Sequence, residues 1–124
     1  MPCWSIGALT EVCSPEPLRG ARQEGHTPGL QVTRISSGGE AAYFIGDVLH
    51  VSLQFGLPEY SPSFDYDQSL SVPSRRRLLD TIQAEGALLI SPHLPFPGVG
   101  RVEGEGTARA FAPLALGPPE EGKL

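Results

Sequence analysis

Two histidines and one aspartate are placed where their side chains could bind a divalent metal ion. Asp47 and His93 each come just past the end of a short apolar run, and His26 lies upstream in the tight turn Gly-His-Thr-Pro-Gly. Aspartate supplies a hard oxygen and histidine supplies an imidazole nitrogen, and divalent ions take both donors when rigid elements hold them. The three residues therefore predict a metal site.

Each of these residues also has an ordinary structural explanation. His26 would be a histidine in a turn, Asp47 a cap at a strand end, and His93 a residue of a surface loop. For any one residue, the two explanations have equal weight. The three residues together, in this order along the chain, favour the metal site.

Other residues near these positions carry weaker functional signals. His50 follows shortly after Asp47, where it would either line the same pocket or have a purely structural role. Phe55, Phe64 and Phe96 would either line a hydrophobic pocket or belong to the core. Because aromatic residues of a small protein more often pack inside, the core explanation is favoured for the phenylalanines.

The apolar runs that precede Asp47 and His93 have the pattern of β-strands. Residues 30–36 are rich in β-branched side chains, and a Ser-Ser-Gly-Gly turn separates them from the apolar residues 41–45. This order predicts a β-hairpin whose second strand positions Asp47. Residues 87–90 are fully apolar, as in a strand buried under a helix, and they lead directly to His93.

A helix is predicted between these two strands. Ser71 is placed to cap it, Pro73 fits its first turn, and Gly86 is placed to end it. The apolar stripe of this helix consists of Leu78, Leu79 and Ile82. The arginines at residues 75–77 are expected on the opposite, solvated side. The strand-helix-strand order places the ends of the two strands at comparable positions in the sheet.

The remaining segments have less regular patterns. Residues 51–67 are rich in aromatic, proline and serine residues without a steady period, which is typical of a loop on the substrate side of a site. Residues 99–102 and 107–111 predict a final hairpin around a Gly-Glu-Gly turn. We expect residues 1–23 to be irregular and residues 113–124 to be a disordered tail.

Three motifs, in this order, resemble the C-terminal half of a metallo-β-lactamase-fold hydrolase. They are the Gly-His-Thr-Pro-Gly turn with His26, the Gly-Asp-Val-Leu-His segment with Asp47, and the His-Leu-Pro-Phe-Pro-Gly loop that begins at His93. They are most similar to the branch that includes acyl-homoserine-lactone lactonases and methyl-parathion-hydrolase-like enzymes. The resemblance runs from about Gly25 to about Phe111.

The resemblance implies an α+β fold for residues 24–112, namely half of an αββα sandwich with a mixed sheet and one main helix. It implies that His26 completes a first metal site, that His93 belongs to a second, and that Asp47 bridges both metals as the catalytic carboxylate. The intact family holds two zinc ions and hydrolyses esters, lactones or phosphotriesters. The family turn commonly continues with another histidine where this chain has Leu30, so one contact near the site is expected to be lost.

The family's H-x-H-x-D-H loop, which supplies the other metal ligands, is missing from this sequence. The histidines of this chain are His26, His50 and His93, and they are too far apart in sequence to form that motif. We therefore expect a truncated hydrolase that binds zinc weakly or partially, is inactive alone, and self-associates through the sheet face that a missing half would cover. The alternative is a non-catalytic α+β interaction module that keeps the scaffold.

Composition narrows the class of protein further. The chain has 124 residues, 40% of them hydrophobic, which suits one domain with its own core. A net charge of −5, with no basic cluster beyond residues 75–77, argues against a nucleic-acid partner. Because there is no apolar run of membrane-spanning length and no recognisable export signal, we expect no membrane partner and a cytoplasmic protein. Cys3 and Cys13 are then expected to be free thiols.

Overall fold

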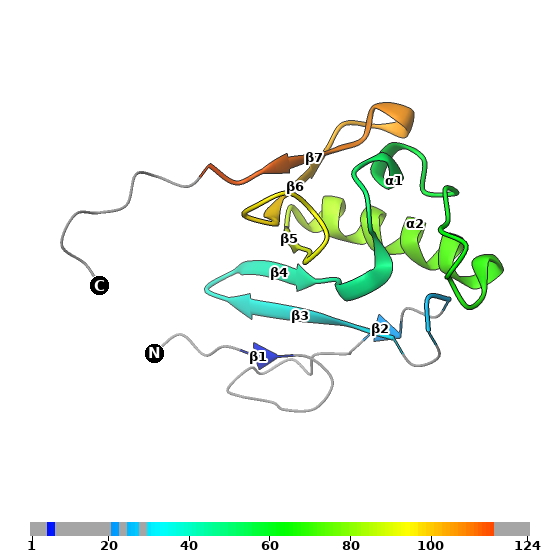
Figure 1. The fold of residues 1–124 in the computed structure, drawn as a ribbon. Helices are drawn as coiled ribbons and strands as arrows, with labels where there is room; N and C mark the ends of the chain where they lie inside the picture. Colours follow the sequence, from blue (N-terminus) through cyan, green and yellow to red (C-terminus); the bar gives the residue numbers. More distant parts are fainter. Residues whose placement is uncertain (1–4, 7–20, 23–24, 28–29, 116–124) are drawn as a thin grey trace.

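The computed structural model describes residues 5–6, 21–22, 25–27 and 30–115. Within these residues, seven strands form one sheet and one long helix packs against it (Figure 1). The predictions for Cys3, Cys13 and the tail from residue 116 onward fall outside the described residues. No helix in the described part of the chain is long and apolar enough to cross a membrane.

The sheet is mixed. Its strands are β1 (Ser5–Ile6), β2 (Ala21–Arg22), β3 (Gln31–Ser37), β4 (Glu40–Phe44), β5 (Leu88–Ile90), β6 (Val99–Glu103) and β7 (Ala110–Pro113). Their spatial order is β1-β3-β4-β5-β6-β7, with β2 also paired to β3. All pairings are antiparallel except that of β4 with β5, which is parallel. The predicted α+β fold with a mixed sheet and one main helix is therefore confirmed.

The β3–β4 hairpin positions Asp47 as predicted. Gly38 and Gly39 in its turn have φ angles of 57° and 83°, which glycine adopts without strain and which match the twist of a tight hairpin. After β4, the chain enters a short 3₁₀ helix, η1 (Gly46–Val48). Asp47 lies in η1, just beyond the end of the strand.

Strands β4 and β5 are parallel neighbours, and the main helix connects them. Tyr43 of β4 lies opposite Leu89 of β5 in the ladder. Because parallel strands run in the same direction, their C-terminal ends lie at the same edge of the sheet. Asp47 follows one of these ends and His93 follows the other, so the predicted strand-helix-strand order brings both residues to one edge.

The main helix, α2 (Gln68–Glu85), begins before the predicted cap at Ser71. That prediction is wrong because Asp67 caps the helix instead: its carboxylate accepts a hydrogen bond from the backbone N–H of Ser69 at 2.9 Å. Ser71 lies inside the helix and is buried. The predicted end of the helix is confirmed, since Gly86 has the left-handed conformation that terminates helices, with φ of 63°.

One side of α2 packs against the sheet, and its predicted apolar stripe is fully buried there. The sheet contributes Val32, Tyr43, Leu89 and Val102 to this core. The predicted solvated side is wrong for Arg75, whose side chain is only 1% exposed, whereas Arg76 and Arg77 are exposed. Burial of Arg75 is possible because Asp65 and several backbone carbonyls accept hydrogen bonds from its guanidinium.

Two loop regions contain short helices that the sequence pattern does not predict. Residues 51–67 include α1 (Leu53–Gly56) and are otherwise irregular. The predicted final hairpin is formed by β6 and β7, but the 3₁₀ helix η2 (Gly106–Ala108) lies between them, so the second strand begins at Ala110 rather than at residue 107. The loop is longer than predicted because η2 occupies residues that the pattern assigns to the second strand, while Gly104 adopts the positive φ, of 81°, that a turn residue requires.

The sheet face opposite α2 carries apolar side chains that no helix covers within the described residues. Successive side chains of a strand point to opposite faces, so Phe44 and Ile90 point away from α2 while their neighbours Tyr43 and Leu89 are buried on the helix side. Phe44 is 42% exposed. Exposed apolar patches of this kind are typical association surfaces.

We expect the isolated chain to self-associate through this face, because association removes its apolar side chains from water. Light scattering should give a mass above that of the monomer, and Phe44→Lys should shift it toward the monomer. Tyr66→Lys is the control, since Tyr66 is exposed but is not part of the sheet. A sharp monomer peak with a cooperative thermal transition and no binding of a hydrophobic dye would show instead that the chain closes its core alone.

Candidate metal centre

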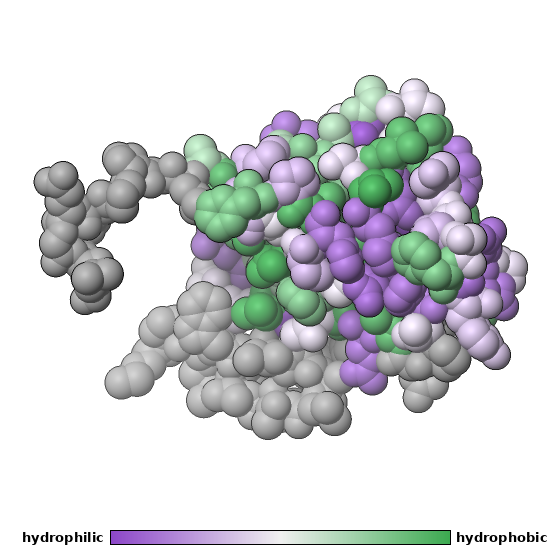
Figure 2. All heavy atoms as spheres, viewed as in Figure 1, coloured by the Kyte–Doolittle hydropathy of each residue, from purple (hydrophilic) through white to green (hydrophobic). Residues whose placement is uncertain are grey.

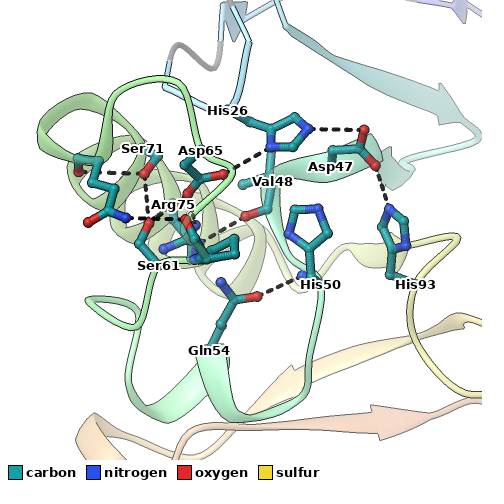
Figure 3. A network of polar contacts seen from close by, with 12 residues as sticks. His26, Asp47, Val48, His50, Gln54, Ser61, Asp65, Ser71, Arg75 and His93 are labelled. Atoms are coloured by element: carbon teal, nitrogen blue, oxygen red, sulfur yellow. Dashed lines mark hydrogen bonds and ion pairs between the residues drawn. The ribbon is translucent and has the colours of Figure 1, made fainter.

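Four polar side chains from three separate segments meet at the edge of the sheet where β4 and β5 end (Figure 3). They are His26, Asp47, His50 and His93. In the space-filling view, hydrophilic residues gather at the surface beside the end of β4, with hydrophobic side chains next to them (Figure 2). The structure thus brings together the three residues that the sequence singles out, and it places His50, for which the sequence left two roles open, beside them.

Asp47 lies between two imidazoles. Its Oδ2 lies 3.3 Å from Nε2 of His26, and its Oδ1 is hydrogen-bonded to Nε2 of His93. The hydrogen bond from His93 is the largest effect and holds the pKa of Asp47 below its ordinary value, although burial opposes it; electrostatic interactions with the surrounding histidines lower the pKa further. Each oxygen of this ionised carboxylate therefore faces a different histidine.

His50 lies between the other two histidines. Its ring centroid is 5.1 Å from that of His26 and 4.7 Å from that of His93. Its Nδ1 is buried and has no hydrogen-bond partner among the described residues. Burial lowers the pKa of His50, and the neighbouring His93 and His26 lower it further. The neutral form of His50 is thus favoured, which is the form that can donate a lone pair to a metal ion.

The backbone of His50 is held by a buried glutamine. Gln54 of α1 accepts a hydrogen bond from the backbone N–H of His50 at 2.6 Å and donates one to the carbonyl of Tyr60 at 2.9 Å. Gln54 is fully buried. Through these bonds, α1 and the loop after it hold the His50 segment against the site.

Asp65, which the sequence analysis does not single out, lies behind His26. One oxygen of its buried carboxylate lies 2.9 Å from Nδ1 of His26, and the other accepts hydrogen bonds from Ser61 at 2.6 Å and from Arg75 at 3.3 Å. Burial raises the pKa of Asp65, but the hydrogen bonds from Ser61 and His26 and the charge of Arg75 outweigh it and hold the pKa below its ordinary value. Asp65 comes from the aperiodic segment of residues 51–67, where no sequence pattern marks it.

Of the three phenylalanines that could line a pocket or belong to the core, Phe55 is buried, whereas Phe64 and Phe96 are exposed. Phe55 is a core residue, as predicted, and stacks on Phe111 at a centroid distance of 5.7 Å. Phe64 is exposed and contacts the rings of His26 and His50 edge-on, so it forms a wall of the site rather than part of the core. Phe96 is 87% exposed, so the core prediction is wrong for it as well.

Leu30 follows the Gly-His-Thr-Pro-Gly turn, at the position where the hydrolase family that this turn resembles commonly has a histidine. It packs against the core beside Gly46, the first residue of η1. An apolar side chain therefore supports the turn that carries Asp47, and no imidazole is present at this position. This difference concerns the surroundings of the site and leaves the contacts of His26 and Asp47 intact.

The donor set fits divalent zinc. His26, Asp47 and His50 each offer one donor atom, and these atoms all lie within 4.8 Å of one another. Zinc is bound in proteins by imidazole nitrogens and carboxylate oxygens. A carboxylate whose oxygens face different imidazoles is also suited to hold two ions at once.

Comparison with known proteins identifies partial relatives among solved structures. AidC, a dizinc quorum-quenching lactonase, has 31% sequence identity to this chain and a TM-score of 0.75. The match covers 81% of this chain and 34% of the AidC chain. AbOPH, a hydrolase of the β-lactamase superfamily, has 30% sequence identity to this chain and a TM-score of 0.75. The match covers 81% of this chain and 35% of the AbOPH chain. This chain therefore spans about a third of the length of either protein.

A more distant structure supports the fold alone. A probable metal-dependent hydrolase from Staphylococcus aureus is 16% identical, with a TM-score of 0.59 over 82% of this chain and 38% of its own. Neither a protein-family model nor a curated protein sequence matches the chain.

Proposed function

Because this chain has the fold of one part of a metallo-β-lactamase-superfamily hydrolase, we propose that it carries half of a binuclear zinc centre. His26, Asp47 and His93 are the proposed ligands, and Asp47 is the proposed bridging and catalytic carboxylate. The proposed activity is hydrolysis of a small-molecule ester, lactone or phosphotriester once the remaining ligands are supplied. The chain alone is proposed to be inactive.

The contacts of Asp47 are the observation that supports this proposal most strongly. Its Oδ2 faces His26 at 3.3 Å, and its Oδ1 is hydrogen-bonded to His93. A carboxylate that bridges two ions places a different oxygen on each ion, and a histidine beside each oxygen could join it as a ligand of that ion. The contacts of Asp47 support such an arrangement.

When bound, a binuclear zinc centre would supply Lewis-acid chemistry, namely activation of water and neutralisation of developing negative charge. The residues of this chain would hold and shield that centre. Asp47, whose pKa is lowered by its histidine neighbours, stays ionised and keeps both of its oxygens available. Phe64 stands edge-on to His26 and His50 and gives this side of the proposed centre an apolar wall.

The number of donors explains why the chain alone is proposed to be inactive. Catalytic zinc usually has three protein ligands for each ion. His26, Asp47 and His93 are shared between two ions in the proposed arrangement, so each ion lacks protein ligands. The dizinc lactonase is about three times as long as the matched region, which leaves room for the other donors elsewhere in such a protein.

The second candidate function is a non-catalytic interaction module. The buried core between α2 and the sheet favours it, because this core is built from described residues of the chain alone. The two candidates make different predictions for the gene: an upstream segment, in any frame, that encodes H-x-H-x-D-H supports the hydrolase half. Absence of such a segment supports the module.

We expect zinc to bind weakly and with fewer than two ions per chain, because an incomplete ligand set loses bonds and preorganisation. Calorimetric titration of the metal-free chain measures both quantities. His93→Ala should weaken binding further, whereas Asp80→Asn, which changes an exposed carboxylate paired with Arg109, should not. A tight site for two zinc ions, or full zinc binding by His93→Ala, would contradict the proposed half-site.

A further inference from the structure

A buried carboxylate lies directly behind His26. The side chain of Asp65 is 0% exposed, and its Oδ1 lies 2.9 Å from Nδ1 of His26. Its other oxygen accepts hydrogen bonds from Ser61 and from Arg75. A carboxylate that faces a guanidinium is ionised and can only accept hydrogen bonds. The proton between Asp65 and His26 therefore resides on Nδ1 of the imidazole.

The other nitrogen of the same ring faces Asp47, so two carboxylates compete for a proton of His26. Asp65 is closer, at 2.9 Å against 3.3 Å, and its side chain is fully buried, whereas that of Asp47 is 45% exposed. Electrostatic attraction is stronger where water is excluded. The hydrogen bond to Asp65 is accordingly the stronger one, and the lone pair of Nε2 is left facing Asp47.

Arg75 connects this arrangement to the turn that carries Asp47. Its Nε donates to the carbonyl of Val48 at 2.8 Å, and its Nη2 donates to Asp65 at 3.3 Å. Val48 directly follows Asp47 in η1. One buried guanidinium thus binds the carboxylate behind His26 and the backbone next to Asp47, although these groups come from different segments of the chain.

We propose that Asp65 is a positioning residue that fixes His26 as the tautomer protonated at Nδ1, and that Arg75 holds Asp65 and the η1 turn in register. This proposal rests on the proposed role of His26 as a zinc ligand, because a ligand nitrogen must be unprotonated. Asp65 acts through His26 and does not itself bind the metal. It makes Nε2 of His26 available on the side where Asp47 lies.

Long-range ¹H–¹⁵N NMR correlation of the metal-free chain tests the tautomer directly. At a pH about two units above the ordinary histidine pKa, His26 should be protonated at Nδ1 alone. In Asp65→Asn the two tautomers should be mixed, because an amide offers a donor as well as an acceptor. The proposal is overturned if wild-type His26 is protonated at Nε2 or at both nitrogens, or if Asp65→Asn leaves the tautomer unchanged.

Two further variants keep this test interpretable. Asp80→Asn is the matched control, since Asp80 is an exposed carboxylate that pairs with Arg109, and it should leave the tautomer of His26 unchanged. If Asp65→Asn does not fold, Asp65→Leu combined with Arg75→Met removes both charges together, which buried sites tolerate better than loss of one partner. A mixed tautomer in the double variant supports the proposal, and the wild-type tautomer overturns it.

A zinc titration separates this proposal from the proposed metal function. Asp65→Asn should weaken zinc binding by about 10–100-fold, while Asp80→Asn should leave it unchanged. If the wild-type chain binds no zinc but shows the Asp65-dependent tautomer, the metal function is wrong and the control of His26 by Asp65 stands. Unchanged zinc affinity in Asp65→Asn would overturn the role of Asp65 in positioning a ligand.

Discussion

Arg75→Ala is expected to lower the free energy of unfolding by about 3–5 kcal/mol, because removing one partner of a buried ion pair leaves the other charge uncompensated. The uncompensated group is Asp65, whose side chain is 0% exposed. The same change also removes the hydrogen bonds that the guanidinium donates to the carbonyls of Val48 and Pro58. Urea denaturation of the wild type and the variant measures the difference.

The neighbouring arginine is the matched control. Arg76 is on the exposed side of α2, and its side chain pairs with Glu59 at 3.2 Å with more than half of both side chains in solvent. Exposed pairs contribute only about 0–1 kcal/mol, so Arg76→Ala should have little effect on stability. A similar loss in both variants, or a loss below about 1 kcal/mol for Arg75→Ala, would contradict a stabilising role for the buried pair.

Zinc-dependent hydrolysis is expected only when the missing ligands are supplied. The isolated chain should not hydrolyse lactone or phosphotriester substrates above the background of the metal buffer, because His26, Asp47 and His93 alone would not complete either of the two proposed zinc sites. Co-expression with the N-terminal half of a related dizinc hydrolase, bearing an intact H-x-H-x-D-H loop, should restore turnover. That half would also cover the apolar face of the sheet around Phe44.

The restored turnover should depend on the charge of Asp47. Asp47→Asn keeps the shape of the side chain but loses the bridging charge, so it should return the rate to background, whereas Asp80→Asn should not. Substantial zinc-dependent turnover by the isolated chain would mean that other residues complete the site. The candidates would then be His50, which lies in the cluster, or Cys3, Cys13 and Glu24.

Local sequence patterns predict the elements that support the site well. The Gly38-Gly39 turn and the apolar runs on both sides specify the β3–β4 hairpin, because a tight turn with positive φ admits few other residues. Gly86 marks the end of α2 for the same reason. The start of α2 is predicted less well, since both Asp67 and Ser71 are residue types that cap helices and the sequence does not choose between them.

The motifs around His26, Asp47 and His93 predict which residues meet at the edge of the sheet. The proximity of Asp47 and His93 follows from the parallel pairing of β4 and β5, which a strand-helix-strand order predicts. His26 is held instead by the loop before α2, where the backbone N–H of Tyr66 donates to its carbonyl at 3.0 Å. His50 is harder to place from sequence. Its position between His26 and His93 depends on its backbone bond to Gln54, which forms only when α1 folds against the site.

The sequence by itself determined the hairpin and the strand-helix-strand order, because these depend on local turns and apolar periodicity, and the resemblance of its motifs to a known family singled out the three residues that meet at the sheet edge. Only the tertiary structure decided that Arg75 is buried and that Asp65 stands behind His26. Arg75 lies beside two exposed arginines of α2, and nothing in its own segment distinguishes it from them. Its burial depends on acceptors from η1 and from the aperiodic loop, which come together only in the folded chain.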